Sequence, residues 1–317
     1  MSGSLPRFRA DLASVLPEGL APGAPLALAV SGGPDSVALL SLAHAALPGQ
    51  VIAATVDHGL RAGSDEEAAL VARACGRLSI PHATLRPDPP IAGGNLHATA
   101  RAARYGLLQA WALGAGANVL ATAHHLDDQA ETFLMRAVRG SGPAGLAGVR
   151  RRRSDGGLTV IRPLLDWRRA ELATVVATAG LEAVADPSNA DERFERARVR
   201  RLLAEQPWLD PAGLAVAARH AGEADAALAD MTALLWRDRA TPGDPLRLDV
   251  TALPREFRRR LARHAIATLA PGFDPATNVE PLLDALEGGR GATQGVVLVT
   301  PHGIEWRFSL APPRRVK

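Results

Sequence analysis

A short segment between two apolar runs, SGGPDS at residues 31–36, carries residue types that can bind a phosphate group. Gly32 and Gly33 have no side chain to keep a ligand away from the backbone, and Pro34 suits the first turn of a helix. The N–H groups at the start of a helix attract anions. The segment therefore predicts a phosphate loop. An ordinary Gly-Pro turn, with Asp35 favoured by the helix dipole, is the alternative from these residues alone.

The loop matches neither of the two common nucleotide loops. The G-x-x-x-x-G-K-S/T loop needs a lysine, but the only lysine of the chain is Lys317, and the dinucleotide loop needs G-x-G-x-x-G. The hexapeptide instead resembles the S-G-G-x-D-S signature of the PP-loop ATP pyrophosphatases, which cleave ATP to AMP and pyrophosphate.

A second group of polar residues, TAHHLDDQAET at 122–132, could perform acid–base chemistry. His124 and His125 close a predicted strand, while Asp128 and Glu131 stand three residues apart on one face of the next helix. The acidic pair could also be an N-terminal cap, and the histidines could belong to a metal site. Because so many charged groups are costly to bury without a use, we expect a functional pocket beside the phosphate loop.

Strands that alternate with helices must position these two groups. Apolar runs predict strands at 26–30, 50–56, 82–86 and 118–123, with helices at 35–47, 64–79, 95–113 and 127–139. The alternation predicts an α/β fold with a parallel, doubly wound sheet. Ligands of such sheets bind outside the carboxyl ends of the strands, where SGGPDS, DHGLR at 57–61 and TAHHLDD all fall.

Composition limits the class of protein. With 317 residues we expect two domains, and 47% hydrophobic residues supply a sizeable core. The single cysteine, Cys75, excludes a disulfide framework and a Cys-based zinc or iron–sulfur site. Because the sequence lacks a long apolar stretch and a signal-peptide core, we expect a cytoplasmic protein without a membrane segment. The net charge is only +3, but clustered arginines predict local surfaces for a polyanion.

Taken in order, a series of motifs resembles the bacterial tRNA(Ile)-lysidine synthases. It comprises SGGPDS, VDHGLR at 56–61, ARAARYGLL at 100–108, TAHHLDDQAET, RGSGPAGLAG at 139–148, IRPLL at 161–165, DPSN at 186–189 and R-x-R-V-R at 196–200. TAHHLDDQAET and RGSG-x-x-GL are the motifs most specific to that family. Beyond residue 208, little of the sequence is similar to it.

The resemblance implies a ligase that acts on RNA. An enzyme of this family uses ATP to adenylate the C2 oxygen of the wobble cytidine in the CAU anticodon of tRNA(Ile). Free L-lysine then displaces AMP to give lysidine, with pyrophosphate as the other product. The implied partners are ATP, L-lysine and tRNA(Ile), with Mg²⁺ as cofactor, and the assembly could be a homodimer.

Carried over position by position, the resemblance implies a role for each candidate residue. Asp35, Arg104 and Asp128 would be catalytic, with Asp35 acting through Mg²⁺ and Asp128 essential for turnover. Arg101, one turn before Arg104, is its natural substitute, and a solvated helix face is the alternative for both arginines. The ATP phosphates would contact Ser31, Gly32, Gly33, Pro34, Asp35 and Ser36, the adenosine would contact Asp57, His58 and Arg61, and the lysine or cytidine would contact Arg101, His124, Asp128 and Glu131.

The chain is expected to divide near residue 206. Residues 1–206 would form the PP-loop catalytic domain, and residues 207–317 a mostly helical C-terminal tRNA-binding domain. Arginine groups at 150–153, 193–201 and 255–263 suit a track of phosphate contacts, although a charge run is commonly a solvated face. Because only 4% of the residues are aromatic, we expect RNA recognition by shape and backbone more than by stacking.

Other functions share some of these features. A PP-loop tRNA thiolase would need cysteines beyond Cys75, and an ammonia-using synthetase would not need a basic C-terminal domain. A nucleotide-binding regulatory module would need the phosphate loop but no acidic pocket beside it. Another PP-loop tRNA-modifying enzyme, or a small-molecule adenylating ligase, is therefore the alternative to lysidine synthesis.

Overall fold

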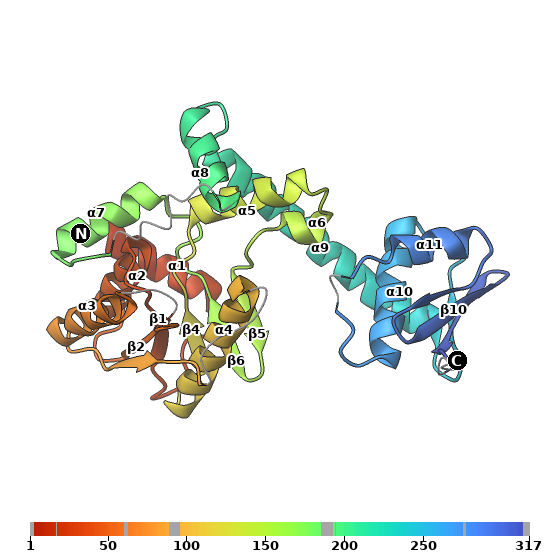
Figure 1. Ribbon diagram of the computed structural model, residues 1–317, viewed down its shortest axis with the longest axis horizontal. Coiled ribbons are helices and arrows are strands. Elements are labelled where there is room, and N and C mark those ends of the chain that lie inside the picture. The colour runs from red at the N-terminus through yellow and green to blue at the C-terminus, as the bar shows by residue number, and fades with distance from the viewer. Residues whose placement is uncertain are drawn as a thin grey trace. The chain divides into compact units, whose positions relative to one another are not determined.

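The computed structural model of the protein describes residues 3–16, 18–59, 63–88, 96–184, 193, 195–274 and 277–312 (Figure 1). The expected DPSN segment and Arg61 lie outside these residues. The chain forms two compact units, Met1–Gly222 and Glu223–Lys317, and the division falls within helix α9, Pro211–Arg239. Within the described residues, no helix is both long enough and apolar enough to cross a membrane.

A six-stranded sheet forms the centre of the first unit, in the order β3-β2-β1-β4-β6-β5. Its pairings are parallel except at one edge, where β5 runs antiparallel to β6. The strands are β1 (Leu26–Ala29), β2 (Val51–Val56), β3 (His82–Leu85), β4 (Val119–Ala121), β5 (Arg152–Asp155) and β6 (Leu158–Ile161). The expected α/β fold with a parallel sheet is confirmed.

Helices cover both faces of this sheet. Leu26 and Leu28 of β1 pack in one hydrophobic cluster with α1, α2, α3 and α7, whereas Ala27 packs in another cluster with α4. A strand buried on both faces must be apolar throughout, which explains the continuous apolar run in the sequence. The helices are α1 (Ser4–Val15), α2 (Pro34–Ala46), α3 (Ser64–Arg77), α4 (Leu96–Gly114), α5 (Leu126–Val138) and α7 (Arg169–Ala179).

The strand order reverses between β1 and β4. The chain builds β1, β2 and β3 outward in one direction and then returns to place β4 on the other side of β1. In doubly wound sheets a crevice forms at such a reversal, outside the carboxyl ends of the strands. The segments that leave this point are SGGPDS after β1 and TAHHLDD after β4, so the topology brings the two predicted groups to one place.

The glycine-rich segment after α5 is anchored to that helix. It contains the short helix α6 (Pro143–Leu146) and precedes α8 (Glu195–Glu205) in the chain. The side-chain amide of Gln129 donates to the carbonyl of Val149 at 2.8 Å, and its Oε1 accepts from the Val149 N–H at 2.6 Å. Gly148 has φ +65°, and a Cβ there would lie 2.4 Å from Gln129 Oε1, so this close approach requires glycine.

The arginine run at 150–153 leads into β5 and is not an open connection. Arg151 pairs with Asp166 at 2.5 Å, and Arg152 pairs with Glu18 at 2.8 Å. The antiparallel pairing of β5 with β6 therefore presents this run on a sheet edge.

The second unit is built on a five-stranded antiparallel sheet, so the expectation of a mostly helical domain was wrong. The strand order is β7-β8-β11-β10-β9, with α10 (Arg255–Leu269) and α11 (Glu280–Glu287). Trp306 and Phe308 of β11 alternate with partly exposed residues and pack in the core of this unit. The strands are β7 (Ala240–Thr241), β8 (Leu246–Asp249), β9 (Ala292–Gln294), β10 (Val297–His302) and β11 (Glu305–Leu310). β7 and β9 have two and three residues, too few for a visible alternation.

Candidate active site

The phosphate loop joins β1 to α2. Gly32 has φ +89°, and a Cβ there would already lie 3.4 Å from the side chains of Val71 and Val184. The Ser36 hydroxyl closes the loop, since it donates to the Gly33 carbonyl at 2.9 Å and accepts from the Ser31 N–H at 3.2 Å. No side chain of the described residues caps the start of α2, where Pro34 occupies the first turn. The remaining N–H groups of that turn therefore suit an anion.

Asp35 connects this loop to the start of α5 through His125. The imidazole of His125 is 1% exposed, and its Nε2 lies 3.3 Å from Oδ2 of Asp35 and 3.6 Å from Oδ2 of Asp128. Its Nδ1 lies 3.5 Å from Oδ2 of Asp127. Burial alone would lower the pKa of His125, but Asp127, Asp35 and Asp128 outweigh burial and raise that pKa to about 9. His125 is therefore a buried cation among three carboxylates.

The two aspartates at the start of α5 are held in their ionised forms. Burial raises the pKa of Asp127, but His125 and the backbone N–H of Arg169 outweigh it and lower the pKa to about 2. Burial also raises the pKa of Asp128, and the charges of His125, His124 and Arg196 lower it further than burial raises it. Asp128 in addition accepts a hydrogen bond from the His125 backbone N–H at 3.1 Å. Asp128 therefore both caps the start of α5 and belongs to the charged cluster.

His124 faces a different neighbour from His125. Its Nδ1 lies 2.9 Å from the hydroxyl of Thr122, and the ring is only partly buried. Its charge contributes to the low pKa of Asp128, which places the two expected pocket residues close together.

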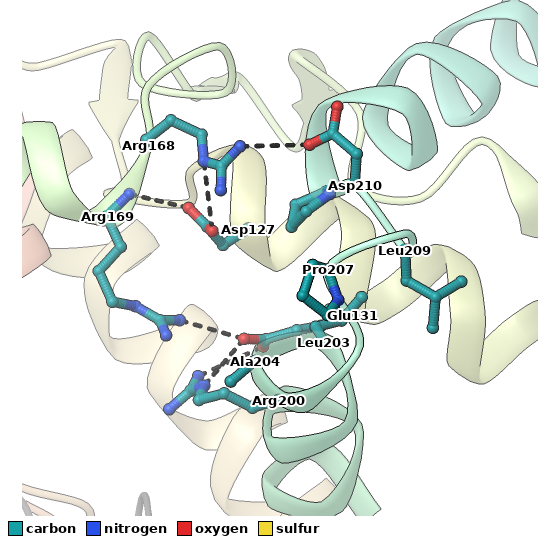
Figure 2. Close-up of a pocket in the computed structure, with 11 residues that line it drawn as sticks. Asp127, Glu131, Arg168, Arg169, Arg200, Leu203, Ala204, Pro207, Leu209 and Asp210 are labelled. Atoms are coloured by element: carbon teal, nitrogen blue, oxygen red, sulfur yellow. Dashed lines mark hydrogen bonds and ion pairs between the residues drawn. The ribbon is translucent and has the colours of Figure 1, made fainter.

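Glu131 lies where three helices meet (Figure 2). Its carboxylate is 1% exposed and lies 3.1 Å from Arg169 of α7 and 2.8 Å from Arg200 of α8. Arg196 of α8 adds a third contact at 3.3 Å. A buried carboxylate needs such partners. Glu131 therefore ties α5, α7 and α8 together and orients these arginines.

A cavity of about 390 Å³ opens beside Glu131 and Asp127. Figure 2 shows Arg168 between two carboxylates, with its guanidinium 3.6 Å from Asp127 and 3.5 Å from Asp210. The lining residues are Asp127, Glu131, Arg168, Arg169, Arg200, Leu203, Ala204, Pro207, Leu209, Asp210 and Pro211. The cavity thus offers charges of both signs and one apolar side, and its volume falls in the range of small-molecule sites, ~300–1,000 Å³.

The residues expected near adenosine follow β2, the neighbour of β1. Asp57 accepts hydrogen bonds from the Gly59 N–H at 3.0 Å and from Arg86 Nε at 2.9 Å. Burial raises the pKa of Asp57, but hydrogen bonds from Ser64, Gly59 and Arg86 outweigh burial and lower it. Asp57 is therefore an ionised group that shapes the segment after β2.

His58 and Arg104 lie near one another. Burial and the positive charge of Arg104 both lower the pKa of His58, so its imidazole is neutral at pH 7. The structure thus brings α4 to the carboxyl end of β2. The side chain of Arg101, the expected substitute for Arg104, lies outside the described residues.

Residues 6–206 match the family model described as the PP-loop domain. A tRNA(Ile)-lysidine synthase from Novosphingobium aromaticivorans is 42% identical over 320 residues, which cover 99% of this chain and 96% of that protein. Another, from Methylobacterium nodulans, is 44% identical and covers 98% of each chain. The chain belongs to the tRNA(Ile)-lysidine synthase family.

A solved structure outside this family shares the fold. The U34-tRNA thiolase NcsA from Methanococcus maripaludis has a TM-score of 0.58 and 17% identity, over 68% of this chain and 76% of that chain. Cys75 is the single cysteine of this chain. It is buried on α3, and burial raises the pKa of its thiol to about 11.

Sequence reasoning did not select several residues at the centre of this family member's site. His125 and His124 stand side by side in one motif, and only burial distinguishes them. Arg169, Arg196 and Arg200 were not assigned to the pocket either. A signal existed for the last two, because residues four apart share a helix face, but their common partner Glu131 lies far away in the sequence.

Four of the five arginines of α10 contact acidic partners within the second unit. Arg255 contacts Glu280 at 3.0 Å and Asp284 at 2.5 Å, and Arg260 contacts Asp225 at 2.7 Å. Further pairs are Arg255–Glu287, Arg258–Glu287, Arg259–Glu256, Arg259–Glu280 and Arg260–Glu256. These pairs neutralise much of the charge that suggested a phosphate track.

Asp35 has the chemistry to hold the Mg²⁺ that the family implies. Its Oδ1 is buried and has no hydrogen-bond partner among the described residues, and carboxylate oxygens are preferred by this cation. In the part of the chain that the structure describes, no group of three or more His, Cys, Asp or Glu side chains is arranged to bind a metal. Asp35 would therefore supply one ligand of an Mg²⁺ ion, and water and nucleotide phosphates would supply the others.

Proposed function

We propose that this protein joins free L-lysine to C2 of the wobble cytidine in the CAU anticodon of tRNA(Ile). The reaction consumes ATP, passes through an adenylated cytidine and releases pyrophosphate and AMP. Membership of the tRNA(Ile)-lysidine synthase family supports this proposal. The observation that carries it is the 3.3 Å contact of Asp35 with His125, because it joins the phosphate loop to the acidic start of α5.

The ATP phosphates are assigned to the loop between β1 and α2. The N–H groups of Gly33 and Asp35 would face the anion, while the hydrogen bond from the Ser31 N–H to the Ser36 hydroxyl holds the loop closed. Pro34 removes an N–H that would lack a partner, and Gly32 allows close approach. Mg²⁺ held by Oδ1 of Asp35 would offset the charge that develops on pyrophosphate.

The adenosine is assigned to the carboxyl end of β2. Hydrogen bonds from Ser64, Gly59 and Arg86 fix Asp57, and the neutral imidazole of His58 can lie against a base without repelling or attracting charge. Arg104 supplies a positive charge at the same end, where it can stabilise negative charge on AMP or pyrophosphate as it leaves. Arg101 remains the proposed substitute for Arg104.

Free lysine is assigned to the cavity beside Asp127 and Glu131. Arg168 and Arg169 suit its α-carboxylate, and Asp127 with Asp210 suits its ammonium groups. Glu131 acts on this pocket through the arginines that it orients. Asp128 is ionised and lies next to His124, so it can accept the proton that the attacking amine must lose.

We propose that residues 1–206 are the catalytic domain, and that residues 207–317 contribute contacts to tRNA in the cytoplasm. The match of the family model to 6–206 supports the first assignment. A homodimer is a further proposal, to be settled by the molar mass of the protein in solution.

The test is pyrophosphate release from ATP, with tRNA and lysine each added or omitted. Release that requires tRNA, followed by stable attachment of labelled lysine to an internal nucleotide, would establish both half-reactions. Release without tRNA, or ammonia in place of lysine, would move the function to a small-molecule adenylating ligase. A sulfur-containing nucleotide would indicate another PP-loop tRNA-modifying enzyme.

A further inference from the structure

Residues 145–150, called here the anchored segment, are held by side chains of α5. Nη1 of Arg136 donates to the carbonyl of Gly145 at 2.6 Å and to the carbonyl of Gly148 at 3.0 Å. The side-chain amide of Gln129 binds both backbone groups of the next residue. A buried segment outside helices and sheets needs such partners, because its carbonyls find none in regular structure. The segment is therefore fixed to α5.

α5 carries this anchor and one wall of the lysine cavity on opposite faces. At about 100° per residue, Gln129 and Arg136 lie two turns apart on one face of the helix. Asp127 and Glu131, which line the cavity assigned to lysine, lie on the opposite face (Figure 2). A single helix therefore connects the cavity with the anchored segment.

α9 packs directly on the anchored segment. A Cβ at Gly222 would lie 3.3 Å from Nη1 of Arg150 and 3.5 Å from Cβ of Ala147. Ala218, one turn earlier on the same face, is fully buried. The carbonyl of Arg150 is itself held by Nη1 of Arg162 at 2.6 Å. Because Gly222 has no side chain, the backbone of α9 rests against a fixed surface, and α6 lies beside α9 in Figure 1.

The start of α9 forms another wall of the same cavity. Asp210 and Pro211 both line the cavity, and Oδ1 of Asp210 accepts from the N–H of Ala212 at 3.0 Å, which caps the helix. Gly222 lies about 16 Å along the helix axis from Pro211. A short helix moves as a rigid element, so a displacement of α9 at Gly222 also displaces its start.

We propose that Arg136 is a positioning residue for lysine binding. It acts through the anchored segment, which sets the place of α9 and with it the position of Asp210 in the cavity. The proposal rests on the proposed function, which assigns this cavity to lysine. The phosphate loop and Asp128 do not belong to α9, so ATP binding and the chemical step should not depend on this contact.

A purely structural role of the anchored segment is the competing explanation. In that case, loosening the segment lowers the amount of active enzyme, so that stability and kcat fall together. Positioning predicts instead that the KM for lysine rises while kcat stays nearly unchanged, because only a binding contact is lost. The two explanations are therefore separated by kinetics.

The experiment uses the full-length protein and two glycines of α9. Gly222→Ala and Gly222→Leu add volume against the anchored segment. Gly213→Leu is the matched control, since Gly213 is exposed on the same helix and a Cβ there would meet nothing within 4 Å. Both leucine variants gain the same helix propensity. The anchor itself is tested by Arg136→Met and by the conservative variant Arg136→Lys.

The measurements are kcat and the KM for lysine in transfer of labelled lysine to tRNA, the KM values for ATP and tRNA, and unfolding by urea. We expect Gly222→Leu to raise the KM for lysine about tenfold, with kcat and the KM for ATP changed by less than about twofold. Gly222→Ala should change little, since its Cβ meets Ala147 at an ordinary contact distance. Gly213→Leu should match wild type.

Arg136→Met should raise the KM for lysine in the same way, because two carbonyls lose their donor. Arg136→Lys should restore most of the lysine affinity, since one ammonium group can donate to both carbonyls.

An unchanged KM for lysine in Gly222→Leu, with lower stability or kcat, would overturn the positioning role and leave the proposed function intact. A rise in the KM for tRNA alone would assign the anchored segment to RNA and would also overturn it. Absence of lysine transfer by the wild type would reject the proposed function and, with it, this role of Arg136.

Discussion

Nε2 of His125 lies 3.3 Å from Oδ2 of Asp35, and this contact joins the first turn of α2 to the cap of α5. This contact therefore fixes the distance between the phosphate loop and the acidic pocket. The imidazolium also separates Asp35 from Asp127 and Asp128, which would otherwise repel one another. The geometry of the site therefore depends on a residue that need not touch any substrate.

His125→Asn should destabilise the first unit and abolish turnover together. Removal of one partner from a buried charged group costs about 3–5 kcal/mol, because the remaining charges stay unpaired. Urea unfolding and tRNA-dependent pyrophosphate release measure the two effects. His302→Asn, in an exposed position, is the control and should change neither. An active His125→Asn protein of normal stability would show that the contact is dispensable.

Asp128→Asn should lower turnover by about 10²–10⁴-fold while ATP still binds, since the amide cannot accept the proton of the attacking amine. Single-turnover transfer of labelled lysine to tRNA measures the loss, and equilibrium binding of an ATP analogue measures retention. Asp166→Asn is a suitable control because that carboxylate is half exposed and pairs with Arg151. Normal lysine transfer by Asp128→Asn would remove Asp128 from its proposed role.

Glu131→Gln should loosen the contact between α5, α7 and α8. Arg169, Arg196 and Arg200 would lose their shared counter-charge, so we expect about 3 kcal/mol less stability and weaker binding of lysine. Unfolding by urea and the KM for lysine are the measurements. Glu205→Gln, which affects only an exposed pair with Arg201, should shift stability by less than about 1 kcal/mol. A Glu131→Gln protein with the stability of Glu205→Gln would contradict the three-helix role.

Protonation of Glu280 should make the second unit less stable in acid. Hydrogen bonds and charge from Arg259 and Arg255 outweigh burial and lower its pKa from 4.5 to about 2. Because the folded state binds the proton less readily, this contribution is complete above pH 4.5 and is lost as the pH falls towards 2. Unfolding of the full chain between these values should show a smaller pH slope for Glu280→Gln than for wild type. Glu305→Gln is the control. An equal pH slope of stability in Glu280→Gln and Glu305→Gln would argue against the effect of Arg259 and Arg255 on Glu280.

Cys75 should be inert towards thiol reagents in the folded protein. It is fully buried, and its thiol has a pKa of about 11, so little thiolate forms at pH 8. Modification should occur only after unfolding, and Cys75→Ala should leave lysine transfer unchanged. Rapid labelling of the native protein, or loss of lysine transfer in Cys75→Ala, would support a role of the Cys75 thiol in the reaction.

The sequence by itself determined the α/β class and the family, and it predicted the position of the candidate site. Those features depend on short-range patterns, namely apolar runs that alternate with helical segments and motifs of adjacent residues such as SGGPDS and TAHHLDDQAET. Because parallel strands share one carboxyl edge, the order of these motifs was enough to bring them together.

Only the tertiary structure decided which side chains meet. His125 is selected over His124 by burial, and Glu131 meets Arg169, Arg196 and Arg200 across 38 to 69 residues of chain. The second unit became a sheet because strands as short as β7 are stabilised by partners distant in sequence and carry no period of their own. Contacts between distant residues are set by packing, and a local sequence pattern does not say which distant residue will be the partner.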